Sequence, residues 1–140
     1  MKRIFAAVFA FALVSALGAY ASAQSPDDTG AGDRLGMQQL NNSGQIGAVT
    51  LFNHGATTNL VVALDSVPPG RVEAVTIHRG RDCDSVDPKA LMRLTDLKNG
   101  RSRSTVKMSQ DKLLSGNYSV LVYSGTQSNA HAVACGHLYR

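Results

Sequence analysis

The sequence predicts an all-β fold: a Greek-key β-sandwich or flattened barrel of about eight antiparallel strands, held by one disulfide. From residue 35 onward, apolar side chains recur at every second position in short runs, and turn residues interrupt these runs about every ten residues. The chain also contains two cysteines, Cys83 and Cys135. In an exported protein two cysteines usually form one disulfide; two free thiols or an intermolecular bridge are the alternatives.

The first 23 residues are expected to be a signal peptide that is removed on export. Lys2 and Arg3 form a positively charged start, residues 4–17 are an uncharged and mostly apolar run, and Ala21-Ser22-Ala23 provides a small-residue cleavage pattern. A retained membrane anchor is the alternative. The apolar run is too short to span a bilayer comfortably, and no later stretch is long or apolar enough to do so.

The rest of the chain is long enough for one domain and too short for two. We expect a flexible leader at residues 24–34, which are rich in Gly and Asp, and one domain at residues 35–140. Two of the 14 Lys and Arg leave with the signal peptide, so 12 cationic residues face 10 Asp and Glu and the net charge falls to +2. Because a signal peptide directs export, the predicted location is the periplasm or the cell exterior.

Eight cationic residues fall between positions 79 and 107. Four aspartates are interleaved with them, and no aromatic side chain in this span could stack on a base. The sequence therefore predicts a solvated loop surface here rather than a nucleic-acid or other polyanion site, and it predicts no membrane span once the signal peptide is removed.

Four strands are expected in the first half of the domain, and residues that favour turns end each of them. Alternation stops at an Asn-Asn-Ser-Gly sequence, at His-Gly and at Pro-Pro-Gly, where the prolines cannot donate hydrogen bonds to a neighbouring strand. In the fourth strand, Thr76 and His78 face outward, away from the core. In order, the runs and turns are residues 35–39, Asn41–Gly44, 47–53, His54-Gly55, 60–64, Pro68–Gly70 and 71–78.

In the second half of the domain, the alternation of apolar and polar residues is less regular at first and is clearest in the last two strands. A charged loop is followed by a stretch of mixed character, a turn at Asn99-Gly100 and a third alternating run. A single helical turn is expected next, with Ser109 as its N-cap and Gly116 as its stop. In order, these segments are residues 79–88, 90–97, 99–100, 104–108 and 111–114, followed by strands within 117–124 and 130–139 around a turn at 125–129.

The inward faces of these runs are predicted to form one apolar core between the sheets. The predicted core positions are Val49, Leu51, Leu60, Val62, Leu64, Val75, Ile77, Val106, Val120 and Val122.

Two segments resemble the copper/zinc superoxide dismutases. Residues 66–83, SVPPGRVEAVTIHRGRDC, look like the segment in which a Pro-Gly turn leads into a strand with two alternate histidines and then into a cysteine loop. Residues 133–138, VACGHL, look like the family's final strand, and NGRSRSTVKMS and GNYSVLVYSG fit between them in order and spacing. The chain is most similar to small exported bacterial proteins on this scaffold, which are relatives of the dismutases and of the chordin-type (CHRD) domain. This resemblance implies an intrasubunit Cys83–Cys135 disulfide.

Most of the metal ligands that the resemblance implies are absent. Thr76 stands at the first position of the family's His-x-His pair, so only His78 remains, and a later copper-ligand position holds Tyr123. The loop after Cys83 contains no histidine for zinc, and the family's active-site arginine is missing at the segment that begins with His131. Because one imidazole does not hold copper against competing ligands, we expect superoxide dismutase activity to be lost.

Two candidate sites remain. The first is a weak copper or zinc site that would combine His78 with Tyr123, and with His131 as a third candidate; a His–Tyr pair that faces solvent is the alternative. The second is a binding surface formed by the loop that carries the cationic candidates and by the turn at residues 124–129, which converge where the resemblance places the metal site. Its candidate residues are Arg79, Arg81 and Lys89.

Three functional hypotheses follow. The leading one is a non-catalytic exported protein with a binding or envelope role and no cofactor; the second is a copper- or zinc-handling protein, and the third a residual redox enzyme. No Ser–His–Asp order, glycine-rich phosphate loop or paired carboxylates point to another enzyme class. The sequence identifies no partner, and exposed strand edges would allow a homodimer to form.

Overall fold

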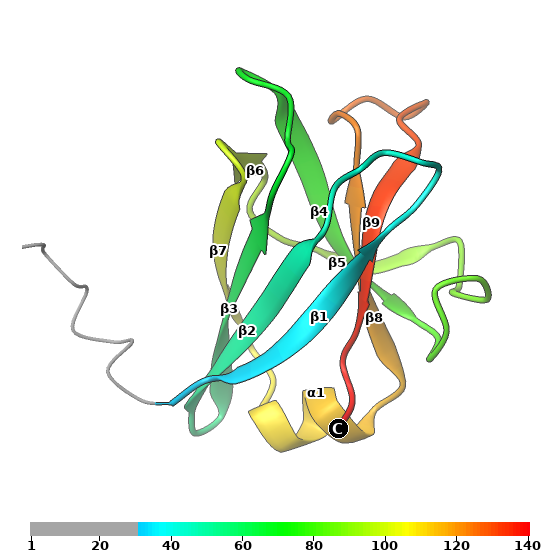
Figure 1. The fold of residues 1–140 in the computed structure, drawn as a ribbon. Coiled ribbons are helices and arrows are strands. Elements are labelled where there is room, and N and C mark those ends of the chain that lie inside the picture. The colour runs from blue at the N-terminus through cyan, green and yellow to red at the C-terminus, as the bar shows by residue number, and fades with distance from the viewer. Residues whose placement is uncertain (1–30) are drawn as a thin grey trace, which may run out of the picture.

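The fold is a closed barrel of eight antiparallel strands, with one extra strand and one short helix in the part of the chain that the structure describes (Figure 1). The computed structural model describes residues 31–140. The expected signal peptide (1–23) and residues 24–30 of the expected leader lie outside them. Strands run around the barrel in the order β4-β6-β7-β3-β2-β1-β9-β8, and β8 pairs with β4 to close it. The predicted all-β class is confirmed.

The elements follow the predicted runs closely. The expected domain began at Leu35, whereas the first strand begins two residues earlier, at Asp33. The stretch of mixed character contains two short strands that pair with the same edge of β4. The elements are β1 (Asp33–Gln39), β2 (Gly47–His54), β3 (Thr57–Leu64), β4 (Val72–Arg79), β5 (Ala90–Arg93), β6 (Leu97–Lys98), β7 (Arg101–Val106), α1 (Gln110–Ser115), β8 (Tyr118–Tyr123) and β9 (Ala132–His137).

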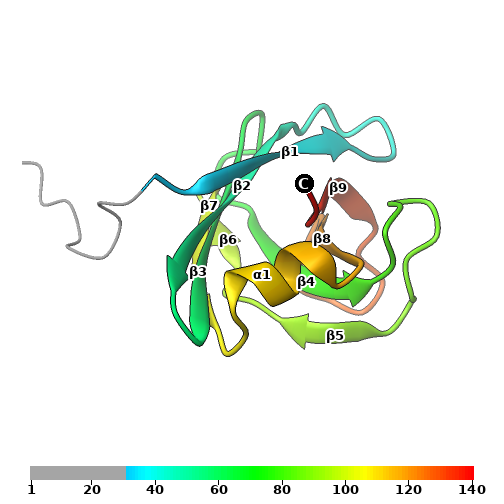
Figure 2. The same cartoon turned by 90° about the horizontal axis from the view of Figure 1, so that it is seen from below.

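Two connections skip neighbouring strands, as in a Greek key. The link from β3 to β4 passes over β6 and β7, because those strands lie between them in the sheet order. The link from β7 to β8 contains α1, which lies across one end of the barrel (Figure 2). Ser109 caps α1, since its side chain accepts a hydrogen bond from the backbone N–H of Lys112 at 3.4 Å. Leu113 of α1 is fully buried and so closes this end.

The turn chemistry also matches the prediction. Asn99 and Gly100 have φ values of 50° and 75°, the left-handed backbone that a two-residue hairpin loop between β6 and β7 requires. Gly116 does end α1, but its φ is −98°, so its role is not a left-handed cap. A Cβ at this position would lie 2.7 Å from the carbonyl oxygen of Lys112 and 2.2 Å from the Tyr118 ring, so the close approach of the chain requires glycine.

The interior of the barrel is a single apolar cluster, and all the predicted core positions belong to it. The other end of the barrel is closed by polar side chains. Glu73 and Gln45 are both buried, and Gln45 Nε2 donates a hydrogen bond to Glu73 Oε1 at 2.9 Å. The pair ties the segment before β2 to the start of β4, and the buried atoms Gln45 Oε1 and Glu73 Oε2 have no hydrogen-bond partner.

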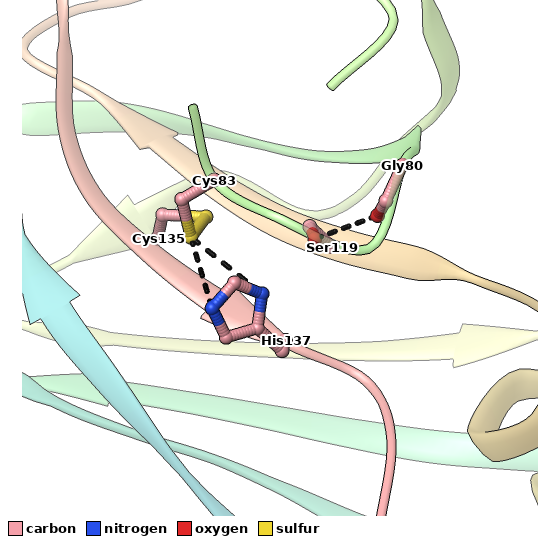
Figure 3. The surroundings of a disulfide bond; sticks show 5 residues. All are labelled: Gly80, Cys83, Ser119, Cys135 and His137. Carbon is pink, nitrogen blue, oxygen red and sulfur yellow. Dashed lines mark hydrogen bonds between the residues drawn. A yellow bond between two sulfur atoms is a disulfide. The ribbon is translucent and has the colours of Figure 1, made fainter. Parts of the chain in front are cut away.

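The loop at residues 80–89 covers the outer side of β4, β8 and β9, which we call the covered face. Cys83 in this loop forms a disulfide with Cys135 on β9, and the Ser119 hydroxyl donates to the Gly80 carbonyl at 2.9 Å (Figure 3). His137 lies beside the disulfide, with its ring nitrogens 3.7 and 3.8 Å from Cys83 Sγ. The predicted disulfide is confirmed, and it fastens the loop to the barrel.

The outer side of β1, β2, β3 and β7 forms the opposite wall, which we call the open face (Figure 2). The described loops contribute no disulfide or strand pairing to this wall. On β7, positions alternate strictly between exposed and buried, and Arg101 and Arg103 are among the exposed ones.

Candidate functional site

A cavity of about 330 Å³ lies on the covered face, between β4, β5, β8 and the turn that links β8 to β9. Its lining is mostly small and polar. The lining residues are Ala74, Thr76, His78, Pro88, Ala90, Arg93, Tyr123, Gly125, Thr126, Gln127, Ser128 and Ala130. The cavity is within the size range of small-molecule sites, and it brings His78 and Tyr123 together, as the resemblance to the dismutases implied.

His78 is held by hydrogen bonds at both ring nitrogens. Its Nδ1 lies 2.6 Å from the carbonyl oxygen of Asp87, which can only accept, so Nδ1 carries the proton. In the neutral imidazole this leaves Nε2 as an acceptor, and Nε2 lies 2.8 Å from Thr76 Oγ1 and 3.3 Å from the Tyr123 hydroxyl. The lone pair that would bind a metal is therefore directed at two hydroxyl groups of the protein.

The alternative of a His78–Tyr123 pair that faces solvent is wrong for His78. Thr76 and His78 do lie on the outer side of β4, but they are only 9% and 2% exposed. The reason is the loop at residues 80–89, since the hydrogen bond to Asp87 and the Cys83–Cys135 disulfide hold that loop over the strand. The polar groups of His78 remain satisfied because the loop backbone and its strand neighbours supply partners.

Tyr123 lines the cavity beside His78, with the two ring centroids 6.3 Å apart. Partial burial raises the pKa of the Tyr123 hydroxyl above its ordinary value, and a hydrogen bond with Thr76 lowers it in part. The phenol therefore stays protonated across the physiological range and acts as a neutral donor. A neutral phenol is a poor ligand for copper or zinc compared with an imidazole.

Other metal candidates do not join this pair. His131 lies in the turn before β9, where its Nδ1 is 3.3 Å from Ser124 Oγ, and it does not line the cavity. His54 is exposed at the end of β2, and His137 lies beside the disulfide. Within residues 31–140, no group of three or more His, Cys, Asp or Glu side chains is arranged to hold a metal ion.

The predicted cationic residues line two further hollows. Arg79 and Arg81 line one of about 570 Å³, and Arg79 and Lys89 line another of about 300 Å³. The Arg81 guanidinium stacks over Tyr139, 4.5 Å from the ring centroid. The loop and the turn at 124–129 do converge, but Pro88 and Ala90, rather than the three cationic residues, face the turn across the cavity.

Arg93 is the residue that sequence reasoning missed. It pairs with Thr76 in the β4–β5 register, so the two side chains leave the sheet on the same side, at the cavity. Its guanidinium also contacts Asp96 at 2.8 Å. The mixed pattern of residues 90–97 did not reveal a strand, and without the strand no register could place Arg93 beside Thr76.

No protein-family model and no curated protein sequence matches this chain. In the described residues, no helix is both long and apolar enough to cross a membrane.

Proposed function

We propose that this chain is a non-catalytic exported protein, periplasmic or secreted, on a superoxide dismutase-like scaffold, and that it binds a small polar ligand in the cavity on the covered face. The hydrogen bonding of His78 carries this proposal. The cavity has the size of a small-molecule site. It offers no free imidazole nitrogen to a metal ion, because Asp87, Thr76 and Tyr123 already bind both ring nitrogens of His78. The Cys83–Cys135 disulfide supports export, since disulfides persist in oxidising compartments.

The lining indicates the chemistry of the ligand. Among the residues that line the cavity, Arg93 carries the one formal charge, and only one of its nitrogens is bound to Asp96. The remaining guanidinium N–H groups can donate to a carboxylate, and the Tyr123 hydroxyl and the Gln127 amide add neutral polar contacts. A small carboxylate is therefore the ligand class that the cavity fits best.

A copper- or zinc-binding role, with residual superoxide dismutase chemistry at His78, is the second candidate. It is favoured by one observation, the 3.3 Å approach of Tyr123 to His78 Nε2 at the cavity floor. A metal ion there would have to displace the hydrogen bond from Thr76 and would gain one imidazole and one phenol. Two such ligands leave most of the coordination sphere to water.

Calorimetric titration of the full-length chain in its disulfide-bonded form separates these candidates. We expect no stoichiometric binding of Cu²⁺ or Zn²⁺, and measurable binding of malonate that is lost in Arg93→Gln. Metal binding tighter than micromolar that disappears in His78→Ala would replace the proposal with the second candidate. If neither metal nor malonate binds, the cavity is not a carboxylate site and this part of the proposal is wrong.

The scaffold itself can be tested by rebuilding the absent ligands. In the double variant Thr76→His and Tyr123→His, three imidazoles would surround the cavity floor, because both positions lie within hydrogen-bonding distance of His78 Nε2. We expect copper affinity to rise strongly in the double variant and little in either single variant. Equal copper affinity in the parent and the double variant would contradict the interpretation of a lost metal site.

A further inference from the structure

The larger of the two hollows that the predicted cationic residues line is separate from the cavity of the proposed function. Its volume is about 570 Å³, and none of its lining residues lines the cavity. One side is formed by the end of β4 and the start of the loop at residues 80–89, and the other by the two residues that follow α1. The lining residues are Arg79, Gly80, Arg81, Asp82, Ser85, Gly116 and Asn117.

Hydrogen bonds fasten the two sides of this hollow to each other. The Gly80 N–H donates to the Asn117 carbonyl at 2.9 Å, and the Gly80 carbonyl accepts from the Ser119 hydroxyl at 2.9 Å (Figure 3). Gly80 has a φ of 128°, a conformation that favours glycine, and a Cβ there would lie 2.7 Å from Val86 Cα. Because the Cys83 disulfide also holds the loop, the side chains around the hollow project from a fixed backbone.

Two exposed arginines, Arg79 and Arg81, supply the positive charge of the hollow. The Arg81 guanidinium stacks on Tyr139, and the Tyr139 ring lies 5.5 Å from the ring of His137. Stacking on one face of a guanidinium leaves the N–H groups at its edge able to donate. No hydrogen bond or ion pair joins the Arg79 guanidinium to another side chain within residues 31–140. Both arginines can therefore donate charge-assisted hydrogen bonds to an oxyanion in the hollow.

The other lining residues restrict what the rest of the ligand can be. Two arginines and one aspartate give the lining a net formal charge of +1. The Asp82 carboxylate repels an oxyanion but accepts hydrogen bonds from hydroxyl groups, and the Ser85 hydroxyl and the Asn117 amide can both donate and accept. None of the described residues that line the hollow is aromatic or large and apolar, so a nucleobase or a lipid tail would find no surface to pack on.

We propose that this hollow binds a sugar phosphate. The phosphate lies on Arg79 and Arg81, and the sugar hydroxyl groups contact Asp82, Ser85 and Asn117. A phosphate monoester carries a charge of about −2 at neutral pH and three acceptor oxygens, which suits two guanidinium groups. The carbonyl end of α1 precedes Gly116 and carries partial negative charge, so it favours hydroxyl groups on that side and the phosphate on the side of the arginines.

Calorimetric titration of the full-length, disulfide-bonded chain with glucose 6-phosphate and with inorganic phosphate tests the proposal. We expect glucose 6-phosphate to bind more tightly than inorganic phosphate. Arg79→Gln with Arg81→Gln should weaken glucose 6-phosphate binding by about tenfold or more. The matched control Arg71→Gln with Arg101→Gln makes the same change in net charge at the other end of the barrel, and it should leave the affinity within about twofold of the parent.

The variant Asp82→Ala distinguishes the phosphate from the sugar. Removal of the negative charge should raise the affinity for inorganic phosphate by about twofold or more. The preference for glucose 6-phosphate over inorganic phosphate should become smaller, because the sugar hydroxyl groups lose their carboxylate acceptor. An unchanged preference would show that Asp82 does not contact the sugar, and the assignment of the ligand as a sugar phosphate would be wrong.

Four further results would overturn the proposal. The first is equal loss of affinity in the control and in the arginine variant, which would show that net charge alone is responsible. The second is an absence of glucose 6-phosphate binding by the parent at millimolar concentration. The third is equal affinity for inorganic phosphate, which would indicate an adventitious ion only. The fourth is tighter binding of phosphoethanolamine, which would make Asp82 the partner of an ammonium group. If the double variant does not fold, Arg79→Gln alone leaves the stack on Tyr139 intact, and it should still lower the affinity.

Discussion

The two outer faces of the barrel are built by the same alternation of side chains, but they differ in what lies over them. On the covered face, His78 and Leu121 point away from the barrel interior and are nevertheless 2% and 4% exposed. On the open face, Arg101 and Arg103 alternate with buried residues in the same way and are exposed. Alternation thus decides on which side of a strand a residue lies, whereas tertiary contacts, such as those of the loop over His78, decide whether that residue meets water.

The largest expected effect comes from placing a charge on each face at an outward apolar position. Leu121→Asp should lower the free energy of unfolding by about 3–5 kcal/mol, because the carboxylate would be buried without a partner. Val61→Asp, on the open face, should cost less than about 1 kcal/mol, because the carboxylate reaches water beside Arg103. Urea unfolding measures both, and similar losses would show that the two faces are not covered differently.

Removal of the disulfide should affect the covered face more than the rest of the barrel. Cys83→Ser with Cys135→Ser removes a link between residues 52 positions apart, which is worth about 4 kcal/mol on the chain-entropy model. Amides of the covering loop, such as Gly80 and Asp87, should exchange hydrogen faster than amides of the β2–β3 pair. A uniform increase in exchange across both faces would show that the disulfide does not specifically hold the loop.

The two histidines His78 and His54 provide a matched comparison of smaller effect. His78→Ala should cost about 2–3 kcal/mol, because the carbonyl of Asp87 and the hydroxyl of Thr76 lose their partner in a buried site. His54→Ala, at an exposed strand end, should change the free energy of unfolding by less than about 0.5 kcal/mol. If both variants melt like the parent, the network around His78 contributes no stability.

The smallest expected effect is a loss of stability at alkaline pH. Burial raises the pKa of Tyr123 in the folded state, so the stability it contributes is complete below the ordinary tyrosine pKa of 10.0 and falls as the pH rises through the folded value. Tyr123→Phe should therefore flatten the dependence of unfolding free energy on pH above 10. If the unfolding free energy of this variant depends on pH above 10 as steeply as that of the parent, groups other than Tyr123 cause the loss of stability at alkaline pH.

Local pattern was sufficient to predict most of the fold. Turn residues such as Asn99-Gly100 and the Ser109 cap act over a few positions, and the core faces follow from the two-residue period of a strand. The short strands β5 and β6 were not predicted, because each is too brief to show alternation and is held by pairing with β4.

The sites depended on contacts that no local pattern contains. The resemblance to the dismutases led to His78 and Tyr123 as neighbours, and the structure brings them together. The burial of His78 could not be predicted, since it results from the loop that Cys83 ties to β9. The alignment of Arg34 with Arg103 on the open face could not be predicted either, because they are distant in sequence and share a row only through three strand pairings.

The state of the His78 ring tests the central claim most directly, because the proposed function depends on both of its nitrogens being occupied by the protein. Nitrogen-15 NMR of histidine-labelled protein in its disulfide-bonded form distinguishes a protonated ring nitrogen from an acceptor. We predict a protonated Nδ1 and an accepting Nε2 in His78, with neither resonance shifted by equimolar Zn²⁺. A protonated Nε2 in the neutral ring, or a shift of the Nε2 resonance on addition of zinc, would contradict this account and make His78 a candidate metal ligand again.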